Sequence, residues 1–208
     1  MTYAQMRRIA YMLLAAAMLL SCTPAHRKEL LPIPYDSLRN GDIVFRSGLS
    51  LSSNMIMMHD GSGKAYSHIG IVCHRDSGWC IVHAENDEPD FPGDFDRVKI
   101  DRIESFFSPE RASAGEIMHS WIDDSTSRII TQRALEYAQD SIPFDSDFNH
   151  NCHDAIYCSE LIYLLYNSVG IDITEGRRTK VGILVFPNEI IFPSDIYKNA
   201  CLKSFFKF

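Results

Sequence analysis

The chain has 208 residues, 46% of them hydrophobic and 23% charged, a composition typical of one globular domain and too short for two large ones. Its net charge of -7, with no basic block to offset it, excludes a nucleic-acid polyanion as partner. The six cysteines are too few for a disulfide framework at this length, so each needs its own explanation.

The N-terminal segment has the layout of a secretory signal. Two arginines precede an apolar run over residues 9–20, which is shorter than a membrane span. The run ends in a small residue followed by Cys22, which resembles the lipobox of bacterial lipoproteins, whose cysteine becomes the acylated N-terminus. We therefore expect residues 1–21 to be a signal peptide, residues 22–34 to be the acylated cysteine and a tether, and residues 35–208 to form one domain. A lipid anchor at Cys22 would hold this domain outside the cytoplasm, with the periplasmic face of the outer membrane favoured over the cell surface.

The first elements of the body are short. A turn with glycine precedes residues 43–45, which predict a strand. Ser52 or Ser53 is expected to cap a brief helix through residues 54–58.

Two β-rich runs then predict a hairpin. Residues 67–74 and 79–85 are joined by residues 75–78, which carry a turn composition. This register places Cys73 opposite Cys80 on the face expected to be buried, where reduced cysteines are favoured over a cross-strand disulfide.

Three polar side chains of the hairpin are predicted to share its other face. Counting outward from the turn puts His68 opposite Glu85, with His83 as the diagonal neighbour. A one-residue bulge would exchange the two faces.

The middle and end of the chain predict alternating strands and helices. The acidic stretch after the hairpin lacks the spacing of a calcium loop and is expected to be a solvated loop. The further elements expected are strands at 97–100 and 117–121, a helix capped by Ser125 with the apolar stripe Ile129, Ile130, Ala134, Tyr137 and Ala138, a strand at 180–186 and a short helix at Ile196.

A cysteine is expected at the start of an amphipathic helix. From Cys158 onward apolar residues recur at steps of three and four until Gly170, the period of a half-buried helix. The positive end of the helix favours a thiolate, and the backbone N–H of Cys158 could stabilise an oxyanion. The alternative is a buried structural cysteine.

These residues together suggest nucleophilic catalysis. A thiol attacks an acyl carbon as thiolate, which an imidazole oriented by a third polar group can generate. The sequence offers Cys158 as nucleophile, His68 as base, and His83 or Glu85 as the third group. No C-x-x-C or closely spaced histidine pair indicates a metal, so neither metal nor cofactor is expected.

Five motifs in this order resemble the permuted papain-like amidases of the YaeF/YiiX type, which are relatives of the NlpC-type cell-wall hydrolases. The motifs are Gly41-Asp42-Ile43-Val44-Phe45, Ser67-His68-Ile69-Gly70-Ile71-Val72, Val82-His83-Ala84, Pro143-Phe144-Asp145 and Tyr157-Cys158-Ser159-Glu160-Leu161. The resemblance implies an α+β fold, with an antiparallel sheet packed against helices and the nucleophile at a helix N-terminus.

The same resemblance implies roles for three residues. Cys158 would be the nucleophile, His68 the general base and then acid, and His83 the orienting group, where the family commonly has glutamate. A neutral His83 can accept a hydrogen bond from His68 but lacks a charge to stabilise the imidazolium, which Glu85 could supply.

The expected function is cleavage of an amide bond in the cell envelope through a thioester. The substrate would be a cell-wall peptide or an acylated small molecule. The alternatives are an acyltransferase or lipid-ester hydrolase with the same triad. A binding lipoprotein without turnover is the alternative from another class.

Overall fold

The computed structural model describes residues 31–59, 66–149, 153–181 and 189–208. The segment Pro32–Phe208 forms one compact unit. The predicted signal peptide, Cys22 and most of the tether lie outside the described residues. Among the residues described, no helix has the length and apolar character needed to cross a membrane.

An antiparallel six-stranded sheet, in the order β4-β3-β2-β1-β5-β8, organises this unit. A separate two-stranded ribbon pairs β6 with β7. The strands are β1 (Ile43–Gly48), β2 (His68–Arg75), β3 (Gly78–Glu85), β4 (Arg97–Arg102), β5 (Ala112–His119), β6 (Thr179–Lys180), β7 (Glu189–Ile190) and β8 (Lys203–Lys207).

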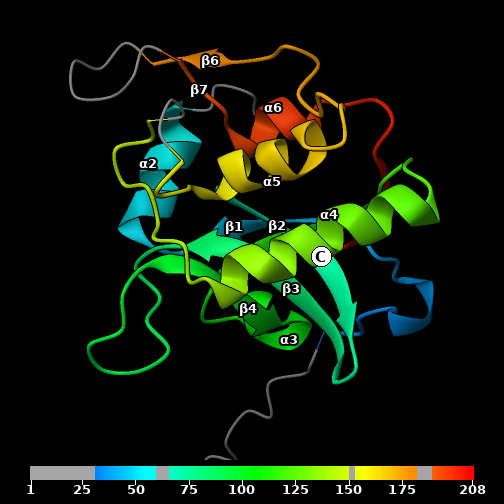
Figure 1. Ribbon diagram of the computed structural model, residues 1–208. Coiled ribbons are helices and arrows are strands. Elements are labelled where there is room, and N and C mark those ends of the chain that lie inside the picture. Colours follow the sequence, from blue (N-terminus) through cyan, green and yellow to red (C-terminus); the bar gives the residue numbers. More distant parts are fainter. Residues whose placement is uncertain (1–30, 60–65, 150–152, 182–188) are drawn as a thin grey trace, which may run out of the picture. The chain divides into compact units, whose positions relative to one another are not determined.

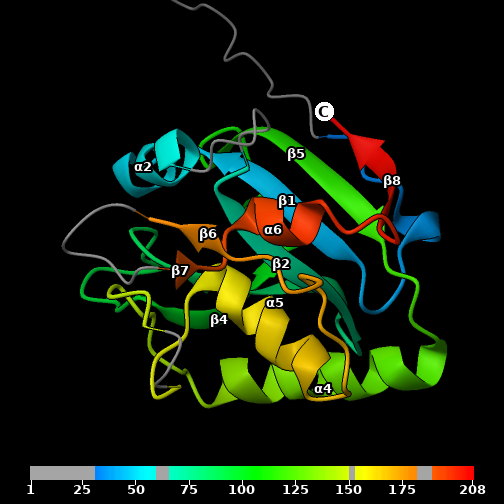
Figure 2. The ribbon, with the colours of Figure 1, turned by 90° about the horizontal axis from the view of Figure 1, so that it is seen from above.

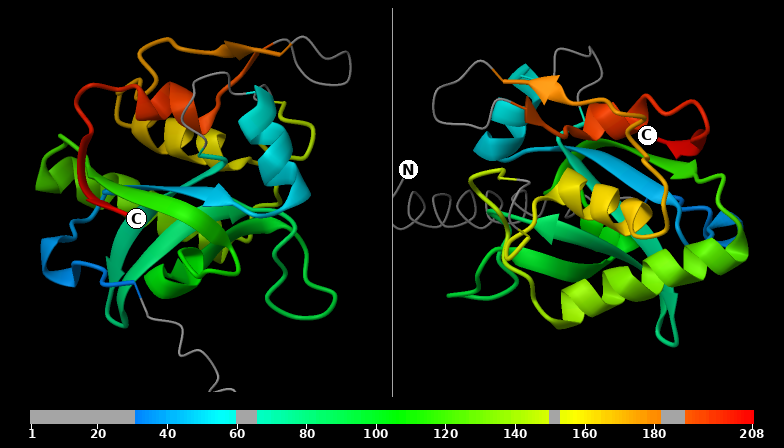
Figure 3. Two further views of the ribbon diagram at one scale, coloured as in Figure 1. Left: turned by 180° about the vertical axis from the view of Figure 1, so that it is seen from behind. Right: turned by 45° about the horizontal axis from the view of Figure 1, so that its top comes forward.

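Helices cover both faces of the sheet, α4, α5 and α6 on one side and α3 on the other (Figures 1 and 2). The helical segments are a 3-10 turn (Tyr35–Ser37), α2 (Leu51–His59), α3 (Ile103–Phe106), α4 (Asp124–Gln139), α5 (Cys158–Asn167) and α6 (Pro193–Tyr197). The long helix α4 lies beside α5 over the sheet (Figure 3, right). The predicted α+β class is confirmed.

The core lies between the sheet and α5. Because side chains alternate along a strand, Ile69 and Ile71 of β2 point toward this helix, where Leu161 and Ile162 of α5 join them in one buried apolar cluster. His68 and its neighbours on the other face therefore lie on the side of α3.

The predicted hairpin is confirmed, including its register. Cys73 pairs with Cys80, and both side chains are buried and free of disulfide bonds. The loop is shorter than predicted, since Arg75 already pairs with Gly78 and two residues form the turn. The reason is that Gly78 has φ +104°, a conformation that glycine adopts without strain, so the strand can start there.

The ladder between β2 and β3 runs from this turn only as far as the pair Ile71 and Val82. Beyond it, β2 continues to pair with β1 up to His68, and β3 continues to pair with β4 up to Glu85. The two strands therefore separate at the end that carries the polar cluster.

The predicted helix caps are wrong in two places. The Ser50 hydroxyl, not Ser52 or Ser53, accepts the Ser53 N–H at the start of α2. Asp123, not Ser125, caps α4, because its carboxylate accepts the Thr126 N–H at 2.8 Å, and a charged acceptor at this position is favoured by the helix dipole.

Other predicted elements differ from the structure in which side chains they bury and in where they lie. Ile129 of the predicted apolar stripe is 57% exposed, whereas Ile130 and Ala134 are buried as expected. The strands β7 and β8 and the short helix α3 were not predicted, because their few residues show no clear period. Most of the strand predicted at 180–186, and Cys152, fall outside the described residues.

Candidate active site

Cys158 is the first residue of α5, as the apolar period predicts. Tyr157 precedes the helix in an extended conformation, and its backbone N–H faces a carboxylate oxygen of Glu160 at 3.4 Å. This contact from the third helical residue back to the N-cap helps to fix where the helix begins and hence where the thiol is presented.

The Cys158 thiol is buried at the place where β2 and β3 separate. It lies 3.8 Å from the Ser159 hydroxyl, and the backbone N–H groups of Ser159 and Ile69 form hydrogen bonds to the sulfur. Ile69 follows His68 in the chain, so the sulfur lies beside the peptide group of the predicted base. Within the part of the chain that the structure describes, no hydrogen bond joins the thiol to the His68 ring.

The expectation of a thiolate at this helix terminus is wrong for the resting protein. Burial raises the pKa of the Cys158 thiol to about 11, and the charge of Glu85 acts in the same direction. The hydrogen bonds from Ser159 and Ile69 lower the pKa but do not outweigh burial. The resting Cys158 side chain is therefore a neutral thiol.

His68 is the first residue of β2 and is hydrogen-bonded to a second imidazole. Its Nε2 lies 2.8 Å from Nδ1 of His83 and 3.3 Å from an oxygen of Glu85. Burial lowers the pKa of His68 well below its usual value, and Arg46 lowers it further. The His68 ring is therefore neutral at neutral pH and can accept a proton.

Both residues considered for the third position lie within reach of His68. The hairpin count that places His68, His83 and Glu85 on one face is thus confirmed. His83 is fully buried, and an oxygen of Glu85 lies 3.1 Å from its Nδ1. Burial disfavours the charged ring, but the negative charges of Asp101 and Glu85, whose oxygens lie 3.3 and 3.1 Å from the ring nitrogens, outweigh it and raise the pKa of His83.

The sequence did not reveal Arg46, which holds the Glu85 carboxylate. Its guanidinium donates to Glu85 at 2.7 Å, to Glu88 at 2.8 Å and to the Phe106 carbonyl at 2.8 Å. Although burial acts in the opposite direction, His68, His83 and Arg46 lower the pKa of Glu85 and keep it ionised. Arg46 lies opposite His68 in the register of β1 and β2. A charged residue directly after the apolar residues of this strand was the sequence signal that could have pointed to it.

Asp101 of β4 is the second residue that the sequence did not reveal. Its Oδ2 lies 3.3 Å from Nε2 of His83 and 2.5 Å from Nη1 of Arg111. The carboxylate is buried, which raises its pKa, but His83, Lys99 and Arg111 outweigh this and lower the pKa of Asp101. The strand predicted from the sequence ends one residue before Asp101, so the sequence did not assign the Asp101 side chain to either face of the sheet.

The same atoms could also hold a metal ion. One ligand atom each from His68, His83 and Glu85 lies within 4.8 Å of the others, the only such group found among the described residues. Two imidazoles and a carboxylate are donors that zinc accepts. However, the two ring nitrogens hydrogen-bond to each other, so a metal bound by both would replace that bond.

Residues 37–191 match the family described as permuted papain-like amidase enzyme, YaeF/YiiX, C92 family. The chain belongs to this family. No curated protein matches this chain. Among solved structures, it is similar to one titled metalloprotein yiiX from Escherichia coli O157:H7, with 18% identity and a TM-score of 0.66.

That similarity covers 82% of this C92-family chain and 97% of the yiiX chain. At this identity it establishes a shared fold. The family membership establishes a hydrolase of the papain-like amidase kind, and the residues that carry the reaction follow as a proposal.

Proposed function

We propose that this chain cleaves an amide bond through a thioester on Cys158, with His68 as the base. The observation that supports this most is the hydrogen bond between His68 and His83 beside the buried thiol. The imidazole pair sits next to Ile69, whose N–H hydrogen-bonds to the sulfur. The family is one of amidases, and a cysteine at a helix start beside a paired imidazole suits acyl transfer to sulfur.

In the proposed reaction the thiol proton moves to Nδ1 of His68 as the sulfur attacks the acyl carbon. Since both groups are neutral at rest, this transfer accompanies the attack rather than precedes it. The backbone N–H of Cys158 stabilises the oxyanion. The imidazolium of His68 then gives its proton to the leaving amine, and water attacks the thioester and releases the acid.

Glu85 supplies the negative charge that the His83 imidazole lacks. Its oxygen lies 3.3 Å from Nε2 of His68, close enough to stabilise the imidazolium that forms during acylation. His83 and Glu85 then have complementary parts: the first orients the ring and the second stabilises its charge.

The proposed substrate is a cell-wall peptide or an acylated small molecule outside the cytoplasm. This rests on the signal-like segment and Cys22, which would anchor the enzyme to the membrane, on the periplasmic face of the outer membrane. Palmitate labelling of the chain in a bacterial host, lost in Cys22→Ala, would support the anchor. An unlabelled, freely secreted wild-type chain would contradict it.

The test of the reaction is to trap the thioester. The domain is mixed with p-nitrophenyl acetate, p-nitrophenyl decanoate or stem-peptide amides, quenched in acid and measured by intact mass. We expect the mass of one acyl group on Cys158, no adduct in Cys158→Ser, and acylation slowed by at least about 100-fold in His68→Ala.

The matched control is His74→Ala, which removes another histidine of β2 at its exposed end. It should acylate like the wild type. If the wild type forms no adduct with any of these acyl donors, the chain is a binding protein on this fold. Product formed with glycine amide in place of water would identify an acyltransferase, and a preference for the decanoate a lipid-ester hydrolase.

A metal centre is the second candidate, because the similar structure is titled a metalloprotein and the donors of His68, His83 and Glu85 converge. Zinc binding by calorimetry, lost in His83→Ala, would support a site there. If acylation survives chelator treatment and zinc inhibits it, the metal competes with the reaction. If acylation requires zinc, the metal candidate replaces the imidazole mechanism.

A further inference from the structure

Phe106, the last residue of α3, contacts three side chains of the candidate site. Its ring is fully buried, and its centroid lies 5.1 Å from the His83 ring centroid, at an interplanar angle of 88°, and 5.6 Å from that of His68, at 35°. The guanidinium carbon of Arg46 lies 4.6 Å from the centroid of the same ring, and the Phe106 carbonyl accepts a hydrogen bond from Arg46 at 2.8 Å. Two imidazoles and a guanidinium therefore pack against one aromatic side chain.

The strand register explains how these groups come together under α3. His68 of β2 lies opposite Arg46 of β1, and Arg46 lies opposite Gly115 of β5. Gly115 in turn exchanges two backbone hydrogen bonds, of 3.1 and 3.3 Å, with Phe208, the residue after β8. Residues opposite each other in antiparallel strands share a face of the sheet, so these four residues form a row across the α3 side.

Phe107 packs along this row and supports Phe106. The buried Phe107 ring lies 5.0 Å from the Phe106 ring and 5.3 Å from the Phe208 ring, edge to face with both. A Cβ at position 115 would lie 2.7 Å from the Phe107 ring and 2.5 Å from the Phe208 ring. Gly115 is therefore required for these two rings to reach the sheet, and through Phe107 they fix the place of Phe106.

We infer that Phe106, held by Phe107, is a positioning residue whose ring fixes the orientation of the His68 and His83 imidazoles. The hydrogen bond between the two imidazoles joins one nitrogen of each, which leaves either ring free to turn about that contact. Close packing against a third ring removes this freedom. The inference rests on the proposed function for its effect on catalysis, but not for the packing, and it holds whichever imidazole nitrogens carry the protons.

The test compares Phe106→Leu, which keeps an apolar side chain and removes the ring, with Phe45→Leu. Phe45 is equally buried but packs on Tyr66 and Tyr197, so the same loss of packing falls outside the site. With p-nitrophenyl acetate, Phe106→Leu should lower the acylation rate at saturating donor at least about tenfold with little change in KM, since a displacement of about 1 Å can cost about 100-fold. Phe45→Leu should acylate like the wild type, although both variants unfold at lower urea concentrations.

The orientation of the imidazoles has a readout that needs no substrate. In protein labelled with ¹⁵N-histidine, the proton between Nε2 of His68 and Nδ1 of His83 is buried and should give an NMR signal protected from exchange with water. We expect this protected signal in the wild type and in Phe45→Leu. In Phe106→Leu it should be lost through exchange, because the rings no longer hold one orientation.

Phe208→Ala tests the support of Phe106 if Phe106→Leu does not fold. Its matched control is Phe205→Ala, since both phenylalanines are partly buried, but Phe205 stacks on His119 at 3.8 Å instead of on Phe107. Phe208→Ala should lower both the acylation rate and the protected signal, and Phe205→Ala should change neither.

The outcomes separate this inference from the proposed function. If the wild type shows no protected signal, or Phe106→Leu retains it, the positioning role is overturned. If the wild type acylates and Phe106→Leu is no slower than Phe45→Leu, the role of Phe106 is overturned and the hydrolase remains. A signal lost only in Phe106→Leu, in a protein that never acylates, supports the positioning role and overturns the hydrolase.

Discussion

The neutral resting thiol leads to a quantitative prediction on alkylation. With a pKa of about 11, Cys158 is far less ionised at neutral pH than an ordinary thiol of pKa about 8.5. The difference of about 2.5 pH units corresponds to roughly 300-fold less thiolate at pH 7, and alkylation follows the thiolate. We therefore expect iodoacetamide to label Cys158 about 300-fold more slowly than a free thiol.

The assay is a pulse of iodoacetamide at a series of pH values from 6 to 9.5, followed by peptide mass spectrometry. Cys201 is exposed and serves as an internal reference. The rate at Cys158 should rise about tenfold per pH unit without reaching a plateau. Glu85→Gln removes a charge that raises the thiol pKa, so labelling should become faster at each pH, whereas His74→Ala should have no effect.

A plateau below pH 8.5, or labelling at pH 7 as fast as that of Cys201, would refute this reasoning. Either result would mean that the thiolate is already formed at rest, as the helix terminus alone suggests. The proton transfer proposed to accompany the attack would then precede it.

Three further substitutions test the packing and charges of the site. Gly70→Ala should lower the free energy of unfolding in urea by about 1–3 kcal/mol and slow acylation, because the new Cβ would lie 2.6 Å from the Ile81 side chain and 3.2 Å from the His83 Cβ. An unchanged unfolding midpoint would contradict this. Arg46→Met should cost about 3–5 kcal/mol at pH 7 by leaving Glu85 unpaired. Since the pKa of Glu85 is lowered in the folded state, the deficit should shrink as the pH falls below about 4.3, and a deficit independent of pH would contradict the pairing. Burial raises the pKa of Glu160 to about 8. The stability that the protonated Glu160 contributes is therefore lost as the pH rises from about 4.3 to 8, and Glu160→Gln should flatten this decline of the melting temperature. If the variant shows the same decline as the wild type, another group causes it.

The hairpin and its polar face could be predicted because a short turn fixes the register. Once Cys73 is opposite Cys80, the two-residue alternation determines that His68, His83 and Glu85 share a face. The start of α5 at Cys158 could be predicted for a similar reason, since the apolar period runs without interruption from that residue.

The environment of these groups could not be predicted, because it depends on contacts between distant segments. Arg46 reaches Glu85 from β1 and Asp101 lies beside His83 from β4, and no local pattern states which strands are adjacent. The thiol pKa likewise depends on how deeply α5 packs against the sheet. A helix terminus alone predicts a lower value, and only the packed structure shows that burial dominates.

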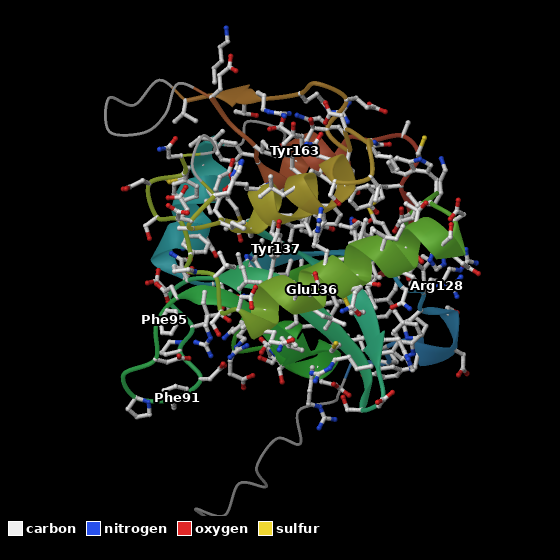
Figure 4. All side chains as sticks on the ribbon, in the orientation of Figure 1. Phe91, Phe95, Arg128, Glu136, Tyr137 and Tyr163 are labelled. Atoms are coloured by element: carbon white, nitrogen blue, oxygen red, sulfur yellow. The ribbon has the colours of Figure 1, made fainter. Side chains whose placement is uncertain are left out.

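Exposed aromatic residues illustrate the same limit. Phe91 and Phe95 lie in the loop between β3 and β4, and they are 57% and 55% exposed (Figure 4). The sequence predicted this stretch as an acidic loop, but nothing in its composition shows that two phenylalanines remain outside the core.

Because β2 and β3 separate next to Ile69, the reactivity of Cys158 reports local opening between α5 and these two strands. Any fluctuation that lifts α5 from the two strands withdraws the amide donor and admits water to the sulfur at once. Desolvation is the larger influence, so the opened form would have the more acidic thiol. Alkylation in dilute urea would then follow local opening well before the whole domain unfolds.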